Sequence, residues 1–265
     1  MTTRRIVTVL DQGRSQSDGL ATFVVLAWGT TWLLALPLAA AWLRGLPGEP
    51  WRIALAGLSA FGPSSAAFLV ARRQRRLGAV FGRFRTSPIW VALALLTPLF
   101  LHLVAKLVHL AFGGRVTQWF WLPQTSAQVA ALFVFSLGEE FGWRGFAHPI
   151  FLRRYGPILG PLATGLVWGI WHLFYSIAPD GSFHLAGFAL TVLELMLWAV
   201  VIAWLFERTN RSMAVALAIH AGGHLDKARV SAEDWRLKAL TLLVLAVAAA
   251  IAARAFSLRS SGEAC

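Results

Sequence analysis

The chain has 265 residues, of which 57% are hydrophobic and only 14% are charged, and its formal net charge is +12. Soluble domains carry about 25% charged residues, so this composition excludes an ordinary soluble globular domain. Apolar segments of about 20 residues, the length needed to cross ~30 Å of hydrocarbon, recur along the whole sequence. We therefore expect an all-α, polytopic integral membrane protein.

Eight transmembrane helices are predicted from these apolar segments. They cover residues 20–43, 51–71, 88–112, 125–147, 157–178, 183–206, 211–226 and 237–256. The fourth is interrupted by a polar motif and the seventh is short. In this prediction, residues 20–256 form a single transmembrane domain between an N-terminal tail, residues 1–19, and a C-terminal tail, residues 257–265.

Arginine and lysine predict the orientation, because short cytoplasmic loops retain an excess of positive charge. The tails and the loops on the side of the two termini hold 15 of the 24 Lys and Arg, and those on the other side hold 7. We expect both termini in the cytoplasm and the Arg-rich loop, residues 72–85, at anionic lipid headgroups. Membrane lipid, and not nucleic acid, is the expected partner of this charge. The arginine-rich composition favours a bacterial inner membrane.

Ionisable residues inside predicted spans are candidates for function, because such a side chain is costly in lipid unless it faces a protein interior or a water-filled cavity. The segment SLGEEFGWRGF, residues 136–146, holds three of them. Glu140 and Arg144 are four residues apart, which predicts an ion pair on one helical face. Glu139 points about 100° away and lacks that partner. An alternative is that all three brace a helix end, packed closely through the three glycines of the segment.

Three histidines lie at helical spacing in two other predicted spans. His172, in LVWGIWHLF, follows Trp168 by four residues, and LAIHAGGHL places His220 and His224 four residues apart on one face. Counting ~1.5 Å per residue along each span, we expect these histidines and Glu139 to share one layer of the membrane. A lone buried histidine is usually a core residue, but this set favours a polar intramembrane cavity. Glu194 either lines the same cavity or is paired by a neighbouring helix.

This set of side chains suits a buried hydrolytic site. A carboxylate held away from water becomes a stronger base, and imidazoles orient water or stabilise an oxyanion. Two or three histidines with a carboxylate also fall within the ligand range of zinc and leave one position for water. The candidate zinc ligands are His172, His220, His224 and Glu139. Zinc and a metal-free glutamate mechanism both remain open from the residues alone.

In this order and spacing, the three polar segments resemble the CAAX protease and bacteriocin-processing family (CPBP or Abi), also called type 2 CAAX prenyl endopeptidases. EEFGWRG, from Glu139 to Gly145, resembles its Glu-Glu-x-x-x-Arg signature. Trp168 to His172 matches its Phe-x-x-x-His motif with Trp in place of Phe. His220 to His224 matches its third motif with His in place of the final Asn or Asp. The resemblance covers residues 138–224.

The resemblance implies an eight-helix membrane fold with a cavity that opens to the membrane and the cytoplasmic side. It implies a glutamate-dependent intramembrane endopeptidase, often described as a metalloprotease, acting on a membrane-associated or lipid-modified protein or peptide. The alternative is a non-proteolytic member of the same family, a membrane scaffold or a bacteriocin-immunity protein, in which the motifs only brace helices.

The resemblance also assigns roles to six residues. Glu139 would activate water, and Glu140, held by Arg144, would support it. The residues that would bind this water or stabilise the oxyanion are His172 and His220, with His224 in the Asn/Asp position.

Overall fold

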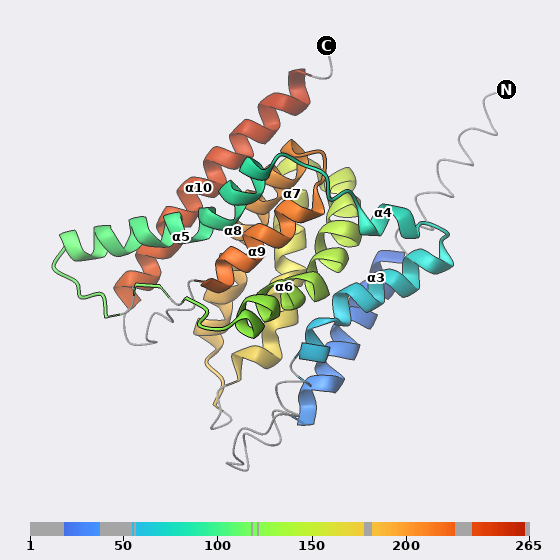
Figure 1. Cartoon of the computed structure of the whole chain (residues 1–265), viewed down its shortest axis with the longest axis horizontal. Coiled ribbons are helices and arrows are strands. Elements are labelled where there is room, and N and C mark those ends of the chain that lie inside the picture. Colours follow the sequence, from blue (N-terminus) through green and yellow to red (C-terminus); the bar gives the residue numbers. More distant parts are fainter. Residues whose placement is uncertain are drawn as a thin grey trace.

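The computed structural model describes residues 19–37, 55, 57–117, 119–120, 122–177, 182–225 and 235–262. The regular elements in these ranges are helices (Figure 1). Isolated β-bridges join Arg83 to Ser212 and Ile177 to Phe183. The expected all-α membrane fold is confirmed.

Five helical stretches are long and apolar enough to cross a membrane. They are Gly19–Pro37, Pro88–Ala111 (α5), Ser126–Phe174, Leu185–Arg208 (α8) and Trp235–Ser257, which lies within α10 (Trp235–Gly262). A sixth apolar helix, α9 (Met213–Leu225), is shorter. The total of eight spans stays a prediction, because part of the second, residues 51–54, falls outside the described residues, as do residues 1–18 and 263–265.

The fourth and fifth predicted spans belong to one helical path. It consists of α6 (Ser126–Glu140), the π-helix η1 (Phe141–Ala147), α7 (His148–Trp171) and the short 3₁₀ helix η2 (His172–Ser176). Gly156 has φ 75° and ψ −172°, a conformation that favours glycine. A Cβ on Gly160 would lie 2.7 Å from Cα of Leu152, so the chain doubles back at Gly156. The boundary between the two predicted spans is therefore a tight turn inside α7.

A capping box at Thr125 and Gln128 starts α6 at Ser126, close to the start of the predicted span at residue 125. The Thr125 side chain accepts a hydrogen bond from the Gln128 backbone N–H at 3.2 Å, and the Gln128 side chain accepts one from the Thr125 N–H at 3.3 Å. This reciprocal capping box satisfies two backbone donors that a helix N-terminus otherwise leaves unpaired. It fixes the start of the helix whose last residues are Glu139 and Glu140.

Small residues let η1 pack directly against its neighbours, α3 (Gly62–Arg73) and α4 (Leu77–Phe81). A Cβ on Gly142 would meet Pro63 at 2.5 Å, and one on Gly145 would meet the Val80 carbonyl oxygen at 2.2 Å. The close packing expected from the glycines of this segment is confirmed, and it leaves no room for a side chain at either position.

The other long helices enclose the segment from the opposite side. α7 packs along α8 and α5 along α9, while α10 contacts both α5 and α8. Tryptophans tie the first helix to α7: Trp28 and Trp32 donate from Nε1 to the carbonyl oxygens of Val167 and Trp171, at 3.2 and 3.1 Å. These bonds fix the last turns of α7, which carry Trp168 and lead into His172.

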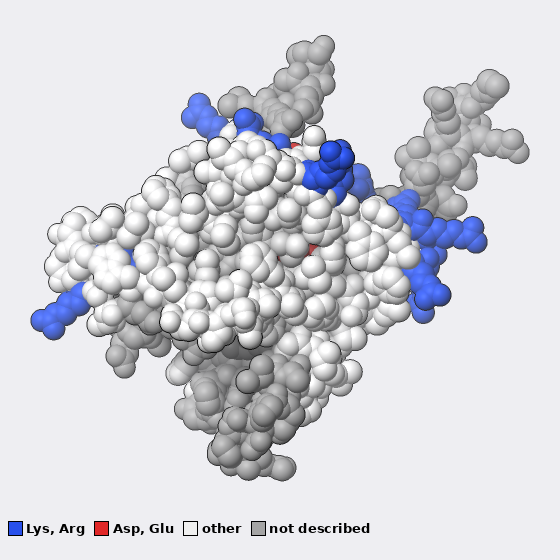
Figure 2. Space-filling model, in the orientation of Figure 1, with Lys and Arg blue, Asp and Glu red and all other residues white. Residues whose placement is uncertain are grey.

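Basic side chains gather along the upper and right edges of the molecule in the view of Figure 2. The turn after α8 meets the segment before α5, because the Met213 N–H donates to the Arg83 carbonyl at 2.6 Å. The Arg208 guanidinium lies 5.7 Å from the Trp90 ring centroid, over its face. Two loops that the charge pattern assigns to the same side of the membrane are thus in contact.

Candidate active site

The six residues that the sequence singles out come from neighbouring elements. Glu139 and Glu140 end α6, and Arg144 lies in η1. His172 follows the last turn of α7, and α9, which packs against α6 and η1, carries His220 and His224. The structure therefore brings His172, His220 and His224, which follow Glu139 by 33 to 85 positions in the chain, to the same region as the two glutamates.

Glu140 is the buried centre of an ion-paired group. Arg144 Nη1 donates to Glu140 Oε1 at 2.7 Å, as the four-residue spacing predicts, and His220 Nδ1 lies 2.6 Å from the same oxygen. The side chains of Glu140 and Arg144 are 0% and 2% exposed. Since a carboxylate oxygen only accepts hydrogen bonds, His220 donates from Nδ1.

Glu139 is held by different partners. Trp168 Nε1 donates to Glu139 Oε2 at 2.7 Å, and Glu139 Oε1 lies 3.7 Å from His220 Nε2. His220 is therefore placed between the two carboxylates, with one ring nitrogen toward each. The two adjacent glutamates separate as their helical angles predict, since Arg144 hydrogen-bonds Glu140 and the indole hydrogen-bonds Glu139.

Trp168 touches most of this group. The Arg144 guanidinium lies over its ring, 4.4 Å from the centroid, and the rings of His220 and His172 lie 5.5 and 5.8 Å away. The sequence predicts only an aromatic side chain at this position, in place of the Phe of the motif. The hydrogen bond to Glu139 was missed, because a hydropathy pattern counts tryptophan as apolar and gives no direction for its N–H.

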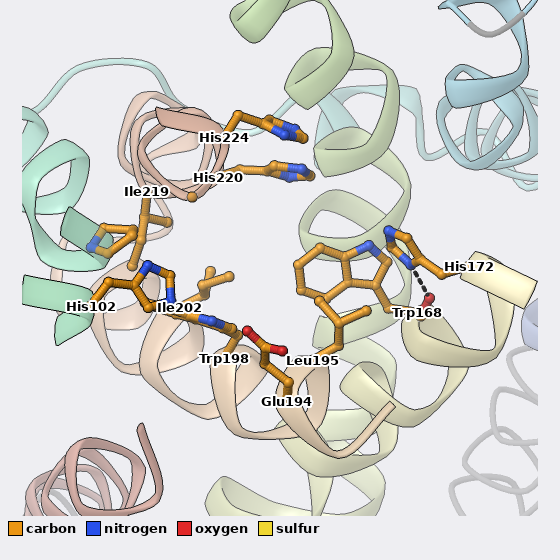
Figure 3. Close-up of a pocket in the computed structure, with 12 residues that line it drawn as sticks. His102, Trp168, His172, Glu194, Leu195, Trp198, Ile202, Ile219, His220 and His224 are labelled. Atoms are coloured by element: carbon orange, nitrogen blue, oxygen red, sulfur yellow. Dashed lines mark hydrogen bonds between the residues drawn. The ribbon is translucent and has the colours of Figure 1, made fainter. Parts of the chain in front are cut away.

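A cavity of about 180 Å³ lies beside the group, between α5, α7, α8 and α9. Figure 3 shows the stacked rings of His220 and His224 on one side, His172 beside Trp168, and the Glu194 carboxylate facing the same space. The other lining residues are Pro98, His102, Leu195, Trp198, Ile202, Ile219 and Gly223. The expected polar intramembrane cavity is thus present, and Glu139 and Glu140 lie behind its wall of Trp168 and His220.

The environment of His172 fixes its tautomer. Its Nδ1 lies 2.9 Å from the backbone carbonyl oxygen of Trp168, which can only accept. Nδ1 therefore carries the proton, and Nε2 of the neutral ring is an acceptor. The rings of His220 and His224 stack with centroids 5.0 Å apart and an interplanar angle of 30°.

Comparison with known proteins agrees with this geometry. Residues 121–225 match the family model described as type II CAAX prenyl endopeptidase Rce1-like, and all six candidate residues lie in that segment. This part of the chain, which carries the candidate site, is therefore similar to that family. The CAAX prenyl protease 2 of Methanococcus maripaludis is 26% identical over 165 residues, which cover 56% of this chain and 60% of that protein. The chain thus matches about three fifths of the length of this curated relative.

The candidate residues belong to a membrane-spanning chain. Five apolar helical stretches of spanning length are found in the described ranges, and one of them, Ser126–Phe174, carries four of the six candidate residues. The candidate site therefore lies within the membrane-spanning part of the chain.

The predicted zinc ligands have different partners. Within the described ranges, no group of three or more His, Cys, Asp or Glu side chains is arranged to hold a metal ion. His220 Nδ1 is engaged by Glu140, and His224 stacks on the His220 ring. Zinc binding by this set with His172 and Glu139 stays a prediction.

The sequence leaves open whether Glu194 lines the cavity or is paired by a neighbouring helix, and in the structure it does both. It lines the cavity, and it is ion-paired with Lys238 at the start of α10. His102 also lines the cavity, with its ring 6.0 Å from that of Trp198. His102 is not among the residues that the sequence singles out.

Proposed function

We propose that this chain is an intramembrane endopeptidase that hydrolyses a peptide bond in a membrane-associated or lipid-modified protein. The observation that supports it best is the setting of Glu139, a buried carboxylate with one oxygen held by Trp168 and the other facing His220, both of which line the cavity. Ionisable residues inside membrane proteins are costly, and they mark functional sites for that reason.

In the proposed reaction, Glu139 is the general base. Because Oε2 is occupied by the indole N–H, Oε1 accepts the proton of the attacking water. The water oxygen bonds to the carbonyl carbon of the peptide, and the resulting oxyanion collapses with cleavage of the C–N bond. Glu139 then returns the proton to the departing amine nitrogen. Glu140 does not leave its partners Arg144 and His220, which keeps their charges balanced beside Glu139.

The two histidines that share one predicted role have different hydrogen-bonding properties. Neutral His172 presents Nε2 as an acceptor, which suits orienting the water or receiving a substrate N–H. His220 donates to Glu140 from Nδ1, and when it carries a second proton it also donates from Nε2 to an oxyanion. We therefore propose that His172 orients the attacking water and that His220 stabilises the oxyanion.

The relative and the charge pattern support a proposal for the substrate class and the location. The relative is named a CAAX prenyl protease, which favours a prenylated protein that ends in a CAAX sequence. The contact between the arginine-bearing segments at Arg83 and Met213 supports a common cytoplasmic side, with both termini there. We place the chain in a bacterial inner membrane.

The test is cleavage of a fluorogenic, farnesylated CAAX peptide by protein reconstituted in proteoliposomes. We expect Glu139→Gln to lower kcat by about 10²- to 10⁴-fold, the usual contribution of a general base, without changing folding or insertion. Glu207→Gln, which changes a glutamate of α8 away from the cavity, is the matched control and should keep kcat. Undiminished cleavage by Glu139→Gln would refute the proposed mechanism. Full cellular function after single Ala substitutions of Glu139, His172 and His220 would favour the non-proteolytic scaffold.

A further inference from the structure

We propose that Trp168 is a positioning residue for the base, acting through its indole N–H. It holds Oε2 of Glu139 and so leaves Oε1 as the oxygen that meets water. This inference rests on the proposed function of Glu139. It concerns a hydrogen bond that the phenylalanine of the family motif at this position cannot make.

The geometry of the bond is that of a strong, shielded contact. Nε1 of Trp168 lies 2.7 Å from Glu139 Oε2, and both residues are 5% exposed. An indole N–H is a donor only, so its direction is not in doubt. Hydrogen bonds to a charged acceptor are about twice as strong as neutral ones, and a low local dielectric strengthens them further.

The ring of Trp168 has a second function that must be separated from the first. It carries the Arg144 guanidinium on its face, at 4.4 Å, and forms the cavity wall next to His172 and His220. A phenyl ring could keep the cation–π contact and most of this wall. The N–H is therefore the part that distinguishes this chain from the family motif, and Trp168→Phe removes it while keeping an aromatic ring.

A consequence follows for the catalytic parameters. Glu139 stands next to the charged Glu140, and its carboxylate can rotate about its terminal torsion, which has broad minima. Fixing Oε2 at the indole removes this freedom before substrate arrives, which is a contribution to preorganisation. Loss of the N–H should thus lower kcat and leave KM nearly unchanged, because the cavity wall remains.

The experiment compares two Trp→Phe variants from the same helix. Trp171 is also buried, at 1% exposure, and its Nε1 donates to Thr31 Oγ1 at 2.9 Å, so Trp171→Phe loses an equivalent bond away from Glu139. We expect Trp168→Phe to lower kcat about tenfold, the value of one hydrogen bond to a charged group, with KM within about twofold. We expect Trp171→Phe to lower thermal stability, because it also loses one hydrogen bond, and to keep kcat within about twofold.

A readout without turnover tests the bond itself. In ¹⁵N-tryptophan-labelled protein in detergent micelles, the indole resonance that disappears in Trp168→Phe identifies Trp168. We expect that resonance to shift in Glu139→Ala and to stay in place in Glu207→Ala.

The outcomes separate this inference from the proposed function. A kcat within twofold of wild type in Trp168→Phe, or an equal loss in Trp171→Phe, would overturn the positioning role while leaving the peptidase intact. If the chemical shift of the Trp168 indole resonance does not change in Glu139→Ala, the hydrogen bond between the two residues is refuted. A wild-type protein that cleaves no farnesylated peptide would overturn the proposed function and the catalytic part of this inference together, even if the indole resonance shifts as expected.

Discussion

Two Glu-x-x-x-Arg pairs occur in this chain, and they lie in different surroundings. Glu140 and Arg144 belong to a cavity cluster that also contains Glu139 and His220, and their side chains are 0% and 2% exposed. Glu207 and Arg211 form the surface cluster with His148, and there the arginine is 48% and the glutamate 17% exposed, while the histidine is buried. The spacing, the ion pair and the neighbouring histidine are common to both.

The comparison shows that sequence spacing specifies a pair, while the surroundings specify its use. In the cavity cluster, His220 stands between two carboxylates and lines a cavity. In the surface cluster, His148 Nε2 lies 3.4 Å from Glu207 Oε1, and Arg211 Nε donates to the same carboxylate at 2.9 Å. Exposed ion pairs contribute little free energy, whereas a buried charge that loses its partner is costly. Variants made in pairs, one from each cluster, test this difference.

The largest contrast in kcat is expected between substitutions of His220, in the cavity cluster, and His148, in the surface cluster. His220→Ala removes the donor assigned to the oxyanion and leaves both glutamates without it, so kcat for a CAAX peptide should fall by about 10²- to 10³-fold. His148→Ala should change kcat only through any loss of folded protein. Measuring kcat at equal folded concentration, determined by size-exclusion chromatography, checks this. Equal losses in kcat would show that the surface cluster also takes part in the reaction.

The next contrast concerns stability. Arg144→Ala leaves Glu139 and Glu140 side by side without a cation, and we expect it to lower the free energy of unfolding by about 3–5 kcal/mol. Arg211→Ala breaks an exposed pair, and about 0–1 kcal/mol is expected. Denaturant-induced unfolding in mixed micelles, followed by tryptophan fluorescence, compares them. A loss below 1 kcal/mol for Arg144→Ala would mean that water screens the cavity cluster.

His224 gives a smaller contrast and tests the metal question. Restoring the family residue by His224→Asn should change kcat by no more than about tenfold, the value of one hydrogen bond, and should leave metal content unaltered. Metal analysis of the purified wild type beside Glu139→Gln and His224→Asn checks this. Stoichiometric zinc in the wild type that disappears in His224→Asn would contradict this expectation and would establish a metalloenzyme.

The smallest effect is expected at the basic end of the molecule. Arg153 lies close enough to three other cations, Arg211, Arg76 and Arg154, for their charges to repel its own. Substituting Arg153 and Arg76 by Gln should weaken the preference for anionic lipid by ~1 kcal/mol per residue, in a salt-dependent way. Quenching by brominated anionic lipid measures this, with Arg236→Gln, at the opposite predicted side, as control. A larger effect of Arg236→Gln would contradict the predicted orientation.

The helical framework could largely be predicted from hydropathy. The segments predicted at residues 88–112, 183–206 and 211–226 correspond to α5, α8 and α9, because long apolar runs in a membrane have few alternatives to a helix. The fourth and fifth predicted spans were less well described. Their boundary is a reversal at Gly156, which depends on one backbone conformation that composition does not reveal.

The site could be predicted only as a set of residues. Helical angles separate Glu139 from Glu140, and the pair with Arg144 follows from spacing. Which carboxylate His220 binds depends on the rotation of α9 against α6, and one sequence carries no signal for that rotation. The Trp168 N–H and the stacking of His224 on His220 likewise depend on side-chain rotamers.

The π-helical form of η1 makes the length of this segment as important as its composition. A π-helix bonds residue i to i+5, so Phe141–Ala147 holds more residues than an α-helix of the same rise. Deleting Trp143 would change the spacing of Glu140 and Arg144 from four residues to three, and that of Gly142 and Gly145 from three to two. The two glycines would then no longer meet Pro63 and Val80 together. Because six of its seven residues are buried, this segment has no room for a side chain at its glycines and no slack for the loss of a residue.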